Sequence, residues 1–242
     1  MKYELIKDDF VINVLGVKLF RIRRISTKEL GGYVESESNL SQSGNAWVSG
    51  DAWVSGDAKV YGNAMVSGNA KVYGNAKVYG DAEVSGNAWV YGDAWVYGNA
   101  WVYGNAKVYG NAKVYGDAEV SGNAWVYGNA WVYGNAKVYG DAEVSGDAWV
   151  SGDAKVYGDA EVYGDAKLRN FDEISKTTHY FNILGFQYPI TVTYSSIHIG
   201  CRDYTIDQLD TVFSDSEYDN NEDIPMIKTM IEIALEKILR DL

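Results

Sequence analysis

One six-residue phrase repeats without interruption over more than half of this chain of 242 residues. Residues 44–169 form 21 successive hexads, each reading Gly, Asn or Asp, Ala, a variable residue, Val, and Tyr or Ser. Only the last hexad departs from this order, with Leu168 at the fifth place and Arg169 at the sixth. A unit this short cannot bury its apolar face by itself, whereas stacked units bury a continuous core. The array therefore predicts a solenoid.

Each hexad combines a short strand with a corner. In the segment Ala, variable residue, Val, Tyr or Ser, the side chains alternate, so Ala and Val point to one side and the other two point away. Gly followed by Asn or Asp suits the corner, because these residues accept a positive φ at little steric cost. The pattern predicts a mainly β protein with Ala and Val inside.

The spacing of small and aliphatic residues, as in Ala46 and Val48, resembles the hexapeptide-repeat family, and the resemblance covers all 21 hexads. It implies a left-handed parallel β-helix in which three hexads form one triangular coil. The 21 hexads would then form about seven coils of 18 residues each. A right-handed solenoid with another coil size is the alternative.

If each residue stacks on the residue 18 positions later, the outward side chains form columns. The candidate interaction surface consists of Tyr61, Tyr79, Tyr97, Tyr115 and Tyr133 in one column, with Trp95, Trp131 and Trp149 among lysines in the column beside it. Exposed aromatic surface is typical of sites for carbohydrate, for protein or for a second copy of the chain. Aromatic residues are also good strand formers that pack on stacked neighbours, and we favour this structural interpretation.

The order of the variable residues argues against one ligand recognised along a column. Glu83 and Glu119 are 36 residues apart, which is two whole coils, whereas Glu119 and Glu143 are 24 residues apart, which is not a whole number of coils. Each such slip rotates the pattern by a third of a turn. We therefore expect a spacer that changes length by hexads and carries its function at the ends.

The corner place holds 11 Asn and 10 Asp residues. Columns of Asp could bind Ca²⁺, but such sites need several converging carboxylates, and the repeat lacks the Gly-Gly-x-Gly-x-Asp calcium phrase. We favour turn chemistry as the reason for these residues.

Residues 1–43 are expected to form a β cap that leads into the solenoid. Residues 3–25 alternate loosely and predict two or three strands. Their expected small core consists of Phe10, Ile12, Val14, Val17, Leu19, Phe20 and Ile22. Val34 and Leu40 are six residues apart, so the hexad rhythm is expected to begin before the perfect repeat.

Residues 170–242 are expected to form a small α+β domain docked on the last coil, because the rhythm breaks at Asn170. Strands are predicted at residues 178–184, 188–194 and 196–201. Thr205 and Gln208 form a capping box that would open a short helix through Phe213. Asp223 and Pro225 would open a second helix. Its apolar stripe would be Ile227, Ile231, Ala234, Leu235, Ile238 and Leu242.

The order of these parts resembles a group of phage, prophage and bacterial repeat proteins related to the YdcK-like and polymer-forming proteins. The resemblance rests on the N-terminal strand pair, on residues 30–48 (LGGYVESESNLSQSGNAWV) and on residues 197–213 (IHIGCRDYTIDQLDTVF). This group has no established function or catalytic residues. The resemblance implies a fold and a phage or prophage origin, and it implies no chemistry.

The search for catalytic chemistry yields little. Hexapeptide-repeat acyltransferases resemble this architecture and use a His between subunits, but residues 44–169 contain no His and no Cys. The candidate tail site is His179, His198, Cys201 and Arg202. A metal site or a nucleophile with its base is the alternative there to a structural role, although His-x2-Cys is no zinc signature and lacks a fourth ligand. We expect no catalytic residue, cofactor or metal.

Charge and composition limit the classes of partner and the compartment that we expect for this protein. The net charge of −12, with −8 in residues 170–242, argues against general nucleic-acid binding. The charged start predicts no signal peptide, and no apolar run is long enough to span a bilayer. One cysteine fits a reducing compartment. We expect a cytoplasmic protein without membrane contact that forms dimers or trimers through flat faces.

Three functions remain open. We favour a non-catalytic scaffold or binding protein, whose rigid rod presents the terminal domains to a host protein or a small molecule, with interference with host defence as one use. A virion or surface structural component is the first alternative. A hexapeptide-repeat acyl- or nucleotidyl-transferase is the second, and it predicts turnover that depends on His179 or His198.

Overall fold

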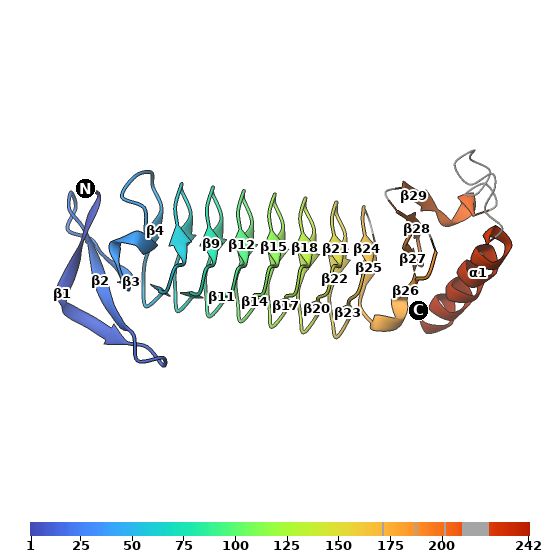
Figure 1. Cartoon of the computed structure of the whole chain (residues 1–242), viewed down its shortest axis with the longest axis horizontal. Helices are drawn as coiled ribbons and strands as arrows, with labels where there is room; N and C mark the ends of the chain where they lie inside the picture. The colour runs from blue at the N-terminus through green and yellow to red at the C-terminus, as the bar shows by residue number, and fades with distance from the viewer. Residues whose placement is uncertain (171, 187, 201, 210–222) are drawn as a thin grey trace.

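The computed structural model describes residues 1–170, 172–186, 188–200, 202–209 and 223–242. The chain forms a long rod with a β-hairpin at one end and a small sheet with a helix at the other (Figure 1). Between them the backbone winds in flat coils that stack along the long axis. The molecule is mainly β, with a parallel β-solenoid as its central part.

Three parallel sheets form the solenoid, built from two-residue strands that each pair with the strand 18 residues later. The first sheet contains β5 (Trp53–Val54), β8 (Lys71–Val72), β11 (Trp89–Val90), β14 (Lys107–Val108), β17 (Trp125–Val126), β20 (Glu143–Val144) and β23 (Glu161–Val162). The second contains β4 (Trp47–Val48), β7 (Met65–Val66), β10 (Glu83–Val84), β13 (Trp101–Val102), β16 (Glu119–Val120), β19 (Lys137–Val138), β22 (Lys155–Val156) and β25 (Glu173–Ile174). The third contains β6 (Lys59–Val60), β9 (Lys77–Val78), β12 (Trp95–Val96), β15 (Lys113–Val114), β18 (Trp131–Val132), β21 (Trp149–Val150) and β24 (Lys167–Leu168).

The described residues form eight coils, one more than the seven expected from the perfect hexads. Val34 pairs with Val54 and Leu40 bridges to Val60, so the first coil begins in the expected cap. At the other end Ile174 pairs with Val156, so parallel stacking continues past residue 169. Val34 and Leu40 are six residues apart, as are Leu168 and Ile174, but the first coil pairs with residues 20 positions later instead of 18.

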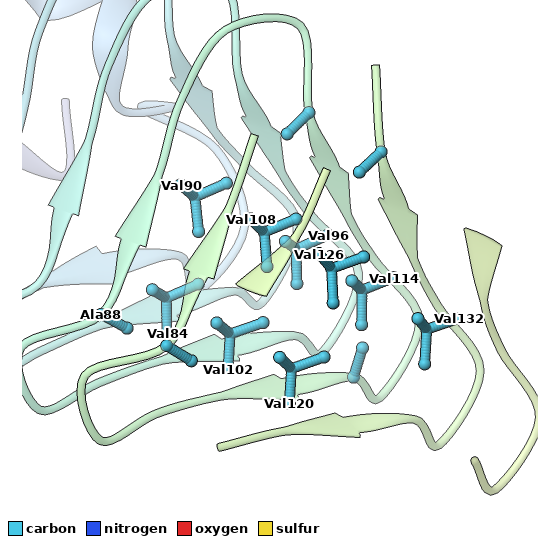
Figure 2. Close-up of a cluster of buried hydrophobic side chains, with 14 of the residues drawn as sticks. Val84, Ala88, Val90, Val96, Val102, Val108, Val114, Val120, Val126 and Val132 are labelled. Atoms are coloured by element: carbon cyan, nitrogen blue, oxygen red, sulfur yellow. The ribbon is translucent and has the colours of Figure 1, made fainter. Parts of the chain in front are cut away.

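The core of the rod is a column of small and branched side chains. Ala at the third place and Val at the fifth are fully or almost fully buried in every coil, and Figure 2 shows the valines of successive coils pointing into the same interior. The glycine corners have φ between 62° and 76° and lie directly on one another. A Cβ built on Gly98 would lie 3.0 Å from the backbone N of Gly116, so these corners need glycine for both conformation and space.

An amide ladder runs along the corners. All eleven asparagines of the corner place donate from Nδ2 to Oδ1 of the Asn or Asp that lies 18 residues later, at 2.8–3.1 Å. The longest run passes from Asn69 through Asn87, Asn105 and Asn123 to Asp141. A run ends at Asp because a carboxylate only accepts. The mixture of Asn and Asp therefore sets where adjacent coils are joined at their corners.

The N-terminal cap is a twisted antiparallel unit of β1 (Tyr3–Ile12), β2 (Lys18–Arg24) and β3 (Leu30–Val34), followed by the 3₁₀ turn η1 (Glu37–Asn39). The expected core of this region is wrong for three of its seven members. Leu19 and Ile22 are fully buried, but Phe10, Ile12 and Val14 are 42%, 64% and 89% exposed. The hairpin extends beyond the coil on which its base packs, so its tip lies against no other element (Figure 1).

The tail contains an antiparallel sheet of β26 (Tyr180–Ile183), β27 (Ile190–Thr193), β28 (Ser196–Ile199) and β29 (Arg202–Thr205), with the 3₁₀ turns η2 (Thr177–His179) and η3 (Ile206–Gln208). Helix α1 (Ile224–Asp241) packs on this sheet. The buried side chains of α1 are the predicted Ile227, Ile231, Ala234, Leu235 and Ile238, whereas Leu242 is exposed. The predicted capping box lies at η3, and residues 210–213 of the expected helix there are outside the described residues.

Candidate functional site

Side chains of the turn η2 and of the tail sheet cap the open edge of the last coil. Within the rod each strand N–H donates to a carbonyl of the next coil, as Trp95 does to Ala112. The last coil has no such neighbour, and the hydroxyls of Thr177, Tyr180 and Thr191 accept the N–H groups of Glu161, Tyr163 and Lys167. Because an open strand edge invites pairing with other chains, this contact protects the rod and fixes the tail to it.

A buried ionic cluster lies at the same junction. Asp172 precedes β25 on the last coil, and His198 lies in β28 of the tail sheet. The imidazole Nε2 of His198 is 2.7 Å from Oδ2 of Asp172, and its Nδ1 is 2.9 Å from Oδ1 of Asp203 in β29. The side chains of Asp172 and His198 are 1% and 0% exposed. One histidine thus joins a carboxylate of the rod to a carboxylate of the tail.

The Asp172 carboxylate is held by further donors. Its Oδ1 accepts hydrogen bonds from the hydroxyls of Thr193, Ser195 and Ser196 at 2.8, 3.0 and 2.5 Å. Its Oδ2 accepts the backbone N–H of Arg169 at 2.9 Å in addition to the imidazole. A buried carboxylate is tolerated when its charge is paired and its lone pairs are used in this way.

These contacts set the charge states of the pair. Burial lowers the pKa of His198, but the hydrogen bonds and charges of Asp172 and Asp203 outweigh it, so the pKa lies above the usual 6.5. Burial raises the pKa of Asp172, and the hydrogen bonds from His198 and Ser196 outweigh it, so the pKa lies below the usual 3.8. The two carboxylates, which face the two ring nitrogens, therefore favour the imidazolium form of His198.

Ser196, His198 and Asp203 have the order of contacts of a nucleophile, a base and an orienting acid, since Oγ of Ser196 is 2.8 Å from Nε2 of His198. The charge state opposes that chemistry. With both ring nitrogens donating to carboxylates, the imidazolium has no lone pair to take the serine proton. Asp172 accepts the Ser196 hydroxyl instead. The arrangement supports a structural lock rather than an activated nucleophile.

A groove of about 420 Å³ opens beside the cluster, with Arg169, Asp172, Ser196, Asp203 and Gln208 in its walls. Its charged groups are paired with one another. Arg169 binds Asp203 at 2.9 Å, and Asp172 binds His198. Asn170 also lines the groove and has a φ of 54° in the turn that follows the last perfect hexad. Pairing within the walls favours positioning of the tail over ligand binding.

The other candidate residues of the tail that the structure describes are His179 and Arg202. His179 lies in η2, is 6% exposed and contacts Ser175, and burial followed by the charge of Lys176 lowers its pKa. Arg202 begins β29 and pairs with Ile199. Cys201 lies outside the described residues. Among the described residues no group of three His, Cys, Asp or Glu side chains has the geometry of a metal site.

The candidate aromatic surface is assembled as the stacking rule predicts. Tyr61, Tyr79, Tyr97, Tyr115 and Tyr133 form one continuous stack with ring centroids 4.8–5.0 Å apart. Trp131 and Trp149 stack at 5.2 Å. Trp95 lies edge-on to Tyr79 and between the ammonium groups of Lys77 and Lys113. Burial and neighbouring tyrosines raise the pKa of Tyr115 to about 12. Much of this aromatic surface is therefore engaged within the rod itself.

Comparison with protein-family models identifies the type of repeat in the rod. A model of the YdcK β-solenoid repeat matches residues 58–74 and 118–134. The central rod is a YdcK-like β-solenoid. No curated protein matches the chain. Among the described residues no helix is both long and apolar enough to cross a membrane. The left-handed sense and the phage origin implied by the resemblance stay predictions.

Sequence reasoning named His198 but missed its partners, Asp172, Ser196 and Asp203. One signal for Asp172 was present. Counting six residues on from Ala166, the buried third place of the YdcK-like hexad falls on Asp172. A carboxylate at a core place needs charged or donor partners from a neighbouring element, and only the tail could supply them.

Proposed function

We propose that this protein is a non-catalytic scaffold or binding protein, in which a stiff β-solenoid holds two terminal units at a fixed distance and angle. The observation that carries the proposal is where exposed apolar surface lies. Fourteen of the eighteen large exposed hydrophobic side chains of the described residues belong to the two ends. They are Met1, Phe10, Val11, Ile12, Val14, Leu15, Ile25 and Leu30 at one end, and Leu184, Met226, Met230, Ile233, Leu239 and Leu242 at the other.

The faces of the rod support this assignment because their side chains largely bind one another. Tyrosines stack on tyrosines, lysines lie over tryptophans and corner amides bond to the next coil. Side chains that already contact one another within the rod have fewer free groups with which to bind a partner. Contiguous exposed apolar side chains, by contrast, are typical of interaction sites on soluble proteins.

The junction supports the proposal from the mechanical side. A spacer transmits a fixed angle only if its end unit cannot swivel. The buried Asp172–His198 pair and the hydroxyl caps on the last coil hold the tail sheet to the rod. The continuous core of the coils then fixes the distance between the hairpin and the tail.

The test is native mass spectrometry of the tagged protein recovered gently from its host, together with two classes of variant. Ile12→Ser with Val14→Ser removes apolar surface from the hairpin tip, and Met226→Ser with Met230→Ser removes it from α1. The matched controls are Tyr97→Ser and Tyr115→Ser within the tyrosine column of the rod. We expect a stoichiometric partner that is lost from at least one end variant and kept by both controls.

Deleting whole repeats separates distance from angle. Removing residues 86–103, which are three hexads, shortens the rod by one coil without turning the tail. Removing residues 86–91 turns the tail by a third of a turn. A scaffold that engages both ends at once tolerates the first deletion better than the second. Loss of the partner in Tyr97→Ser, with both end variants unaffected, would contradict the proposal. The same spectra report the oligomeric state, for which a dimer or trimer is predicted.

A further inference from the structure

Trp101 differs from the seven other tryptophans of the rod. Each of those seven indole rings has a lysine or arginine over it. The cations are Arg24 over Trp47, Lys71 over Trp53 and Trp89, Lys107 over Trp89 and Trp125, Lys77 and Lys113 over Trp95, Lys113 over Trp131, and Lys167 over Trp149. Within the described part of the chain no cation lies over Trp101, and this residue is 51% exposed.

The covered rings follow a regular geometry set by the coil. Where a lysine occupies the same place one coil before a tryptophan, its Nζ lies 4.3–4.5 Å from the ring centroid, as for Lys77 and Trp95. A lysine one coil after the tryptophan lies farther away, at 5.3–5.8 Å. The solenoid thus holds an alkylammonium group over one face of the indole wherever the preceding coil supplies one.

Trp101 has carboxylates at both of these places. It pairs with Glu83 in the preceding coil and with Glu119 in the following coil. Glu119 is occupied, since it binds Lys137 at 2.9 Å and accepts a hydrogen bond from the Tyr103 hydroxyl. The side chain of Glu83 makes no hydrogen bond or ion pair with any described residue, and it is exposed.

The missing ring of a neighbouring column leaves a hollow beside Trp101. At the sixth place of the hexad Tyr103 stands one coil after Ser85. Tyr103 therefore has no aromatic side chain to stack on in the preceding coil. A cavity of about 200 Å³ fills this gap, lined by Glu83, Ser85, Trp101 and Tyr103. It presents an uncovered indole, a phenol and an unpaired carboxylate to one small volume.

We propose that this cavity binds an alkylammonium group supplied from outside the chain, with the chemistry of a lysine side chain. The ammonium lies over the Trp101 ring and pairs with Glu83, while the methylene stem packs in the gap left by Ser85. The site reproduces the arrangement that the rod makes internally at Trp89, Trp95, Trp125 and Trp131, with the cation coming from a ligand. This binding site goes beyond the scaffold role and does not depend on it.

The test is a titration followed by NMR at the indole N–H of Trp101, assigned from the Trp101→Phe variant. The probes are butylammonium, as a free small cation, and Nα-acetyl-lysine N-methylamide, as the side chain of a polypeptide. Nα-acetyl-norleucine N-methylamide is the neutral control. A saturable shift with both cations shows that the group alone is recognised, and a shift with the lysine derivative alone identifies a polypeptide source. Equal shifts with the neutral control overturn the proposal.

Three variants sharpen the result. Glu83→Gln keeps the shape of the side chain and removes the charge, and we expect binding of the cation to weaken about fivefold. Glu161→Gln, at the same place of a distant hexad, is the matched control and leaves the titration unchanged. Glu83→Lys places an internal ammonium where Lys77 lies over Trp95, so it abolishes binding and raises the melting temperature. Undiminished binding in Glu83→Lys would contradict the proposed position of the cation.

Discussion

The rod and its junction with the tail are held together in different ways. In the rod each contact is modest and recurs every coil, so the loss of one is shared by many equivalent neighbours. At the junction one ionic cluster, in which Asp172 and His198 are buried and Asp203 is partly exposed, joins two units whose sequences have no common period. Repetition therefore gives the rod tolerance, and the unique cluster gives the tail a single orientation.

The largest expected effect comes from breaking the junction. Asp172→Ala leaves the His198 imidazolium buried beside one remaining carboxylate, and losing one partner of a buried pair costs about 3–5 kcal/mol. We expect hydrogen exchange to accelerate in β27 and β28 while β12 and β15 stay protected. Asp165→Ala, at an exposed corner of the adjacent hexad, is the control and leaves exchange in the tail unchanged. Equal acceleration in both variants would remove the distinction between junction and rod.

The second-largest expected effect is a loss of stability when a glycine corner of the rod is substituted. Gly98→Ala forces a φ of 73° on a residue with a Cβ and brings that Cβ within 3.0 Å of Gly116, so we expect a loss of about 2 kcal/mol in the free energy of unfolding. Gly16→Ala is the matched control, because Gly16 has a φ of 77° but nothing within 4 Å of the added atom. Urea denaturation measures both. A loss no greater in Gly98→Ala than in Gly16→Ala would show that the close stacking of corners adds nothing to the conformational cost.

A smaller effect is expected from the amide ladder, and it tests whether single hydrogen bonds between adjacent coils add to the stability of the rod. Asn105→Asp removes one donor, so the bond to Asn123 is lost at a cost of about 1 kcal/mol. Asp93→Asn creates a donor facing Asn111 and is expected to stabilise the rod slightly. The melting temperatures of the two variants, compared with that of the unmodified protein, measure both effects. Opposite signs confirm a directional ladder, and destabilisation in both would contradict it.

The smallest effect is the dependence of tail docking on pH. Because the pKa of His198 is raised, its contribution is present below the usual 6.5 and is lost as the pH rises through the folded value. Because the pKa of Asp172 is lowered, its contribution is present above the usual 3.8 and is lost as the pH falls through the folded value. Protection of β28 from exchange, corrected for the intrinsic pH dependence of amide exchange, should therefore be greatest between these two limits. His198→Gln should abolish the alkaline part of the profile.

Two parts of the chain show how far pattern reasoning reaches. The hexads correctly predicted the stacking offset, the buried Ala and Val places and the columns of tyrosine, because one contact rule repeats along the rod. In the hairpin the same reasoning failed, since alternation identifies a strand but does not say what covers it. Phe10 and Val14 occur in an alternating segment, but both side chains are exposed.

The sequence by itself determined the rod, because each side chain of a solenoid meets the residue at a fixed offset and every partner can be read from the chain. Even the carboxylates on both sides of Trp101 follow from that offset. Only the tertiary structure decided the junction. Asp172, His198 and Asp203 share no period, and their meeting depends on how the tail sheet docks on the last coil. The charge of His198 is likewise a property of that docking, since it requires two carboxylates from different units to face one ring.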